Sequence, residues 1–179
     1  MAYLIIHGAE GSGPEHWQTW IAGRLRERGL EVSYPELPDA DAPRLDRWLA
    51  ALHDELERLP AAETTVLCHS IGSLLWLHHD GVEVARALLV APPQPDVEVP
   101  PAVGFRPAPR GRSAARETRF VCSTDDPWCP PETSRSMAEA LGAPIDWIEH
   151  GGHINTDAGF GPWPTLEAWC LVEAERLQG

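Results

Sequence analysis

The chain has 179 residues and a formal net charge of −13, with 27 acidic side chains against 14 basic ones. Every basic side chain is arginine, and a chain without lysine cannot perform Schiff-base chemistry, hold pyridoxal phosphate on a lysine or supply a P-loop lysine. The acidic balance argues against a nucleic-acid partner, because binding to a phosphate backbone needs clustered basic side chains. A chain of this length is expected to fold as one domain, residues 1–179.

The cysteines and the first residues of the chain indicate the cellular compartment. The four cysteines have no C-x-x-C spacing, and the first apolar run is too short, and lacks the basic flank, for a signal peptide or a membrane span. We therefore expect reduced thiols, a cytoplasmic location and no membrane association. The same apolar run predicts a first buried strand.

Short apolar runs alternate with longer helical patterns along the chain. The runs that predict strands are 3–6, 31–34, 65–68, 87–90, 119–122 and 145–148. The patterns that predict helices are 16–28, 43–59, 72–80, 131–141 and 164–177. This alternation predicts an α/β fold with a mostly parallel sheet of about six strands and helices on both faces.

One irregular stretch, 92–112, is rich in Pro, Gly and Arg and looks too polar to be another core element. We expect a long connection within the domain. Long loops in compact domains are often functional, so this stretch is a candidate wall for a substrate site, with a plain surface excursion as the alternative.

A serine follows the predicted strand 65–68 and precedes an apolar helical pattern. A serine on such a strand-to-helix turn is typical of a nucleophile elbow, usually G-x-S-x-G, in which a strained backbone exposes the hydroxyl. Here Cys68 stands in place of the first glycine, and Gly72 keeps the second. Two alternatives to Ser70 as nucleophile stay open: Ser70 could cap the following helix, or Cys68 could be the nucleophile, although a cysteine ending a buried strand is more often an inert small hydrophobe.

A serine nucleophile needs a base, and the base needs an orienting acid. Asp125 and Asp126 follow one later predicted strand, and His150 and His153 follow the next. The carboxyl ends of parallel strands lie at one edge of a sheet, so these side chains can converge with Ser70. The order Ser, Asp, His is that of α/β-hydrolases. We predict His153 as the base, with His150 as the alternative, and either aspartate as the acid.

Backbone N–H groups are expected to hold the developing oxyanion. We predict the N–H of Ile71, which follows the nucleophile, and the N–H of Ala9, in the glycine-rich loop after the first strand. Three aromatic residues, Trp17, Phe105 and Trp128, lie beside the catalytic loops or in the irregular stretch. They are candidate walls of an apolar acyl site, with burial in the core as the alternative for each.

The histidines do not predict a metal site. His78-His79-Asp80 and the pair His150 and His153 lack a third ligand cluster at a recognisable spacing. We expect neither a metal nor a cofactor.

At these residues the sequence resembles the family of small serine hydrolases that includes the bacterial YdeN-like proteins and the vertebrate retinoblastoma-binding serine hydrolase. The resemblance spans most of the chain and rests on segments 7–8, 16–17, 69–72, 123–127, 152–155 and 159–164. It implies a minimal α/β-hydrolase fold with a six-stranded sheet, no large cap domain, and hydrolysis of small esters or amides. It also favours Asp126 over Asp125, because the family's catalytic aspartate precedes a proline. Cys68 departs from the glycine of the relatives.

The predicted function is a carboxylesterase-like serine hydrolase that acts on a small-molecule acyl substrate through an acyl-enzyme. Without a cap domain, the site should be shallow and favour small acyl groups. The main alternative is a protein-binding module on a hydrolase scaffold with weak or vestigial activity, whose protein partner the sequence does not specify. A second alternative is another reaction on the same scaffold, such as perhydrolysis or cofactor-free cleavage of a carbon–carbon bond.

Overall fold

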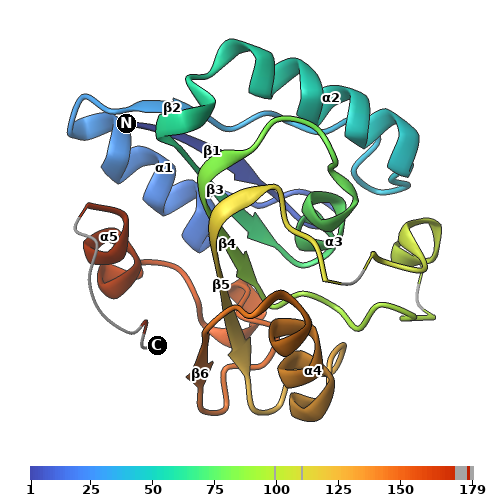
Figure 1. Cartoon of the computed structure of the whole chain (residues 1–179). Helices are drawn as coiled ribbons and strands as arrows, with labels where there is room; N and C mark the ends of the chain where they lie inside the picture. The colour runs from blue at the N-terminus through green and yellow to red at the C-terminus, as the bar shows by residue number, and fades with distance from the viewer. Residues whose placement is uncertain (99, 110, 172–176, 178–179) are drawn as a thin grey trace.

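The computed structural model describes residues 1–98, 100–109, 111–171 and 177. Its centre is a six-stranded sheet in the order β2-β1-β3-β4-β5-β6 (Figure 1), in which every neighbouring pair is parallel. The strands are β1 (Ala2–Ile6), β2 (Glu31–Ser33), β3 (Thr64–His69), β4 (Val84–Val90), β5 (Ala115–Ser123) and β6 (Ile145–Ile148). The helices are α1 (Trp17–Glu27), α2 (Leu45–Arg58), α3 (Ile71–His78), α4 (Pro131–Leu141) and α5 (Pro164–Leu171). The predicted parallel α/β architecture is confirmed.

Helices cover both faces of the sheet, which explains why β1 and β3 are buried along their whole length. All of β1 is buried, and its side chains alternate between two cores because successive residues of a strand point to opposite faces. Leu4 and Ile6 belong to the core that includes α2, α3 and α4, whereas Tyr3 and Ile5 belong to the core that includes α1 and α5. Figure 1 shows these two helix groups on opposite sides of the strands.

The ends of the predicted elements shift by a few residues. Predicted strand 145–148 and predicted helix 131–141 have the observed bounds, whereas the helix predicted to reach residue 80 ends at His78. It ends there because His79 has an extended backbone, with its N–H bonded back to the last turn. The helix predicted over 164–177 is seen as α5 as far as Leu171; the rest of that range, apart from Leu177, lies outside the described residues.

The irregular stretch 92–112 corrects one expectation. Its composition predicts a segment too polar for the core, yet Val97, Ala102, Phe105 and Ala108 are buried in the core shared by α2, α3 and α4. The prediction is wrong because the apolar side chains of this stretch are spaced between polar ones with no regular period, so that composition hides them. Two of them, Ala102 and Phe105, begin and end a short 3-10 turn, η2 (Ala102–Phe105). Among the described residues no separate cap domain covers the edge of the sheet, as the resemblance implied.

At the turn between β3 and α3, the chain packs tightly against the end of β1, and this packing positions Ser70. Ser70 has φ +53° and ψ −130°, a strained conformation for a residue with a side chain. A Cβ atom on Gly72 would lie 2.5 Å from the carbonyl oxygen of His7 and 2.9 Å from that of Ile6. Glycine at 72 therefore allows the start of α3 to lie directly against the end of β1.

Substituting Gly72→Ala is expected to lower the free energy of unfolding by about 3 kcal/mol or more, because the new methyl group meets backbone oxygens that cannot easily move. The matched control is Gly23→Ala within α1, where an added Cβ meets no atom within 4 Å. That control is expected to stabilise the protein by about 0.5–1 kcal/mol. Urea unfolding of both variants checks this, and equal stability of the two would contradict the close packing.

Candidate active site

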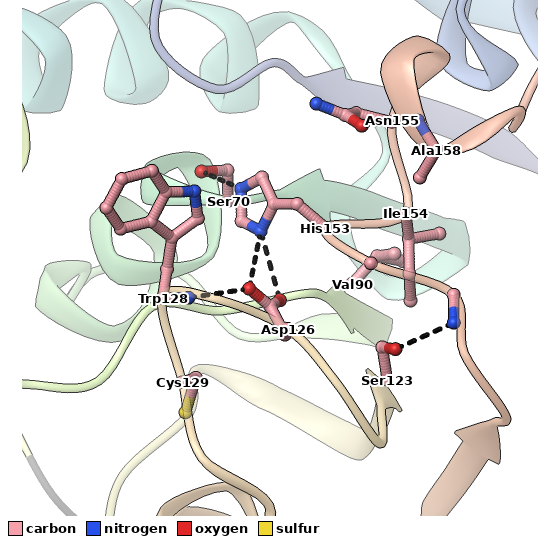
Figure 2. A network of polar contacts seen from close by, with 12 residues as sticks. Ser70, Val90, Ser123, Asp126, Trp128, Cys129, His153, Ile154, Asn155 and Ala158 are labelled. Carbon is pink, nitrogen blue, oxygen red and sulfur yellow. Dashed lines mark hydrogen bonds and ion pairs between the residues drawn. The ribbon is translucent and has the colours of Figure 1, made fainter.

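Three side chains from the ends of three strands form one hydrogen-bonded chain (Figure 2). Ser70 follows β3, Asp126 follows β5 and His153 follows β6. The Ser70 Oγ lies 2.9 Å from the His153 Nε2, and the His153 Nδ1 lies 3.1 and 3.0 Å from the two carboxylate oxygens of Asp126. Because a carboxylate only accepts, Nδ1–H donates to Asp126, which leaves Nε2 free to accept the Ser70 proton. Ser70 makes no side-chain capping bond to α3, contrary to the possibility that it serves only as a helix cap.

The structure gives the two neighbouring aspartates different contacts. Asp126 faces the His153 ring and also accepts the Trp128 N–H at 2.9 Å. Asp125 instead accepts the Ser123 hydroxyl at 2.7 Å and the Gly152 N–H at 2.8 Å. The Ser123 hydroxyl, followed by that N–H, lowers the pKa of Asp125. Asp125 thus links the loop that contains His153 to the end of β5 by hydrogen bonds, whereas Asp126 contacts the imidazole itself.

Neither His150 as a base nor Cys68 as a nucleophile is well placed for catalysis in this site. The side chain of His150 is 85% exposed, and its ring lies 3.7 Å from Asp125. Cys68 is fully buried within β3, and burial raises the pKa of its thiol. A protonated thiol without access to the surface is a poor nucleophile.

Ser70 opens into a cavity of about 450 Å³. Its described lining residues come from the loop after β1, the elbow, the 92–112 stretch and the loops after β5 and β6; they are Gly8, Ala9, Glu10, Gly11, Gly13, His16, His69, Ser70, Ile71, Pro93, Pro100, Pro101, Ala102, Trp128, His153, Asn155, Thr156 and Asp157. The Trp128 ring stands edge-on to the His153 ring, with 6.5 Å between the centroids. A larger cavity, about 730 Å³, lies by the first halves of β4 and β5, and Ser70 is not among its lining residues.

Two aromatic residues predicted as walls of the site are core residues instead. Trp17 has no exposed surface and donates its Nε1–H to the Ile154 carbonyl at 3.0 Å. Phe105 is also fully buried and packs edge-on against Trp48, with 5.4 Å between the centroids. Large aromatic side chains gain most from full burial, and the fold provides the space for both. Prolines of the same irregular stretch form the wall in their place.

The predicted oxyanion donors border the cavity. A Cβ on Gly8 would lie 2.8 Å from the Ser70 Cβ, so the loop that carries Ala9 lies against the nucleophile candidate. Ile71 is the first residue of α3, and the first N–H groups of a helix have no partner within the helix. These backbone groups are suited to hold a negative charge that develops next to Ser70.

Two buried histidines that the sequence interpretation did not assign lie beside His153. The His69 ring donates Nε2–H to the carbonyl oxygen of His153 at 3.0 Å, and its centroid is 4.9 Å from that of His16. His16 caps α1 by accepting the Gln18 N–H on Nδ1. Burial lowers the pKa of both rings, to about 4 for His16, and the nearby His153 is the second cause. The sequence did offer a signal for each: His16 lies at the start of a predicted helix, and His69 directly precedes Ser70 in the elbow.

The low pKa values of His16 and His69 make acid destabilising. In the unfolded chain each imidazole has its ordinary pKa of 6.5, so it binds a proton at a pH where the folded ring stays neutral. The contribution of these two rings to the free energy of unfolding is therefore complete above pH 6.5. It is expected to fall as the pH drops toward 4, by up to about 3 kcal/mol for His16 alone. Urea unfolding between pH 7 and 4.5 measures the slope, and His16→Gln should flatten it. A slope unchanged in that variant would contradict the assignment.

Membrane-spanning helices and clustered metal ligands are both missing from the described ranges. Within those ranges, no helix combines the length and hydropathy that a membrane crossing needs. In the same part of the chain, no three side chains of His, Cys, Asp or Glu are grouped so that they could hold a metal ion.

Comparison with known proteins places the chain in a family. Residues 3–170 match the sequence model of a family described as serine hydrolase. The chain is 28% identical over 173 residues to the hydrolase YdeN of Bacillus subtilis (strain 168), with 90% of each chain covered. The crystal structure of the B. subtilis ydeN gene product matches with a TM-score of 0.80 and 25% identity over 95% of this chain and 96% of that one.

A YdeN-like hydrolase from Pectobacterium atrosepticum has the same fold, with a TM-score of 0.77 and 24% identity over 94% of this chain and 87% of that one. Est1E of Butyrivibrio proteoclasticus, solved with ferulic acid, matches with a TM-score of 0.67 and 15% identity over 95% of this chain and 88% of that one. Given an α/β-hydrolase fold and a family match that runs from β1 into α5, the chain belongs to the serine hydrolase family.

Proposed function

We propose that the protein cleaves small esters or amides through an acyl-enzyme, with Ser70 as nucleophile, His153 as general base and Asp126 as the orienting acid. The observation that carries this proposal is the unbroken hydrogen-bonded chain from the Ser70 hydroxyl through the His153 imidazole to the Asp126 carboxylate. Each group lies within the reach that proton transfer requires. Membership of the serine hydrolase family supports the same chemistry.

In the first half of the reaction, Ser70 Oγ bonds to the acyl carbon while its proton moves to His153 Nε2. Asp126 stabilises the imidazolium that forms. The carbonyl oxygen becomes an oxyanion, which accepts hydrogen bonds from the backbone N–H groups of Ile71 and Ala9. The bond to the leaving group then breaks, and the leaving alcohol or amine takes the proton from His153.

In the second half, water attacks the acyl-enzyme and gives its proton to His153. The tetrahedral intermediate collapses, the carboxylic acid departs, and the proton returns to Ser70. The cavity of about 450 Å³ is at the small end of ligand sites. Its size favours short acyl groups, which rest against Trp128 and the proline wall, in keeping with carboxylesterase-like activity.

Labelling with a fluorophosphonate tests the proposal. The folded protein is expected to gain one adduct by intact mass, with peptide mapping to Ser70, and to turn over p-nitrophenyl acetate. Protein unfolded in urea serves as the control and should remain unlabelled, because an isolated serine hydroxyl is a weak nucleophile. A folded protein that is neither labelled nor active on the ester would overturn the proposal and favour the protein-binding alternative.

A further inference from the structure

The cavity at Ser70 has an unusual balance of charge. Its titratable lining residues among those described are two carboxylates, Glu10 and Asp157, and three histidines. No described lining residue is arginine, and the sequence contains no lysine. The walls therefore bring negative charge and no permanent positive charge to the substrate.

The histidines do not offset the two carboxylates at neutral pH. His69 and His16 are buried, and burial lowers the pKa of each ring, so both are neutral. His153 must itself be neutral to accept the Ser70 proton. The resting cavity thus carries a formal charge of about −2 from its rim.

The two carboxylates remain unpaired among the described residues, unlike several carboxylates elsewhere on this surface. Glu27 and Glu55, for example, each form an ion pair with an arginine three residues away in the chain. Glu10 and Asp157 are exposed, and no described arginine lies within ion-pair distance of either. Their charges are free to act on a bound ligand.

Both carboxylates sit on loops whose backbones are held in place. Glu10 has φ +61°, and its N–H bonds to the Ala40 carbonyl at 2.8 Å. Asp157 lies in a 3-10 turn, η3 (Thr156–Ala158), which the Asn155 side chain caps by accepting the Ala158 N–H. One carboxylate comes from the loop after β1 and the other from the loop after β6, so two separate loops bring negative charge to the cavity.

We infer that the cavity selects acyl substrates that carry a positive charge, such as esters or amides bearing an ammonium group, over isosteric anionic ones. This inference rests on the proposed function and names its substrate class. Two unneutralised carboxylates at the rim of the cavity attract a cation and repel an anion, both during approach and in the bound state. Acyl donors with phosphate or carboxylate groups next to the scissile bond are disfavoured.

The experiment compares three acetate esters of similar shape: acetylcholine, the neutral 3,3-dimethylbutyl acetate and the anionic 2-sulfoethyl acetate. A second set carries the trimethylammonium, tert-butyl or carboxylate group on the acyl side. Each kcat/KM is divided by the rate of hydroxide-catalysed hydrolysis of the same ester. The cationic ester is expected to exceed the anionic one by about 10-fold at low ionic strength in at least one set, and salt should reduce this ratio.

Two double variants separate local from global charge. Glu10→Gln with Asp157→Asn should bring the ratio of the cationic to the anionic ester close to one. The control, Asp54→Asn with Glu57→Gln on the exposed side of α2, changes the net charge equally and should keep the ratio. If the control loses the ratio as well, or if wild type shows none, the inference fails. Turnover of the neutral ester without any charge preference would contradict only this inference. If no ester were hydrolysed, the proposed function would be contradicted as well.

Discussion

Replacement of Ser70 by alanine is expected to lower kcat for a short-chain ester by at least about 10³-fold, since it removes the Oγ atom that we propose attacks the acyl carbon. The residual rate would come from the remaining oxyanion donors and from substrate binding. The fold should survive, because alanine keeps the Cβ that packs near Gly8 and Ser70 makes no capping bond to α3. Steady-state kinetics and thermal unfolding of the variant measure both quantities.

The control for this variant is Ser136→Ala, which removes an exposed hydroxyl from α4, away from the cavity. It should match wild type in rate and in thermal stability. A Ser70→Ala protein that keeps more than about a tenth of the wild-type rate would place the nucleophile elsewhere.

Replacement of Asp126 by asparagine is expected to lower kcat by about 10³ to 10⁴-fold with little change in KM. The variant loses the charge that stabilises the imidazolium. Its amide can also donate to Nδ1, which would turn the His153 ring to the tautomer that cannot accept the Ser70 proton. The pH profile of kcat is the most direct readout, because it follows the protonation of His153.

Asp125→Asn is the matched comparison, since it makes the same chemical change one residue away. Asparagine keeps an Oδ1 atom to accept from Ser123 and Gly152, and Asp125 does not contact the His153 ring. We expect less than about a 10-fold loss. Equal losses in the two variants would mean that both aspartates act by holding loops and would remove Asp126 from its proposed role.

The fold could be predicted from the sequence because its main signals are local. Short apolar strands alternating with amphipathic helices define a parallel sheet, and parallel strands bring their carboxyl ends to one edge. That edge brought Ser70, Asp126 and His153 together, although 83 residues separate Ser70 from His153. The nucleophile-elbow pattern also predicted the strained backbone of Ser70 and the need for a small residue at 72. In the structure Gly72 packs against the end of β1, where a larger residue would not fit.

Other features could not be predicted because they depend on tertiary packing. Nothing in the residues around Phe105 shows whether its ring faces the cavity or Trp48, and the structure places it against Trp48. Spacing alone also left Asp125 and Asp126 equivalent, and only the position of the β6 loop distinguishes their contacts. The low pKa of His69 follows from burial among other rings, which a sequence does not reveal.

The irregular stretch 92–112 has a consequence for how the substrate range of this protein could change over evolution. Its core residues, among them Val97 and Phe105, anchor the segment, while Pro100 and Pro101 line the cavity and are not buried. Mutations on the cavity side can therefore reshape the site without loss of the anchor, and they leave Ser70 and His153 untouched. Directed evolution toward new acyl groups would do best to begin with these two prolines and to hold the core residues constant.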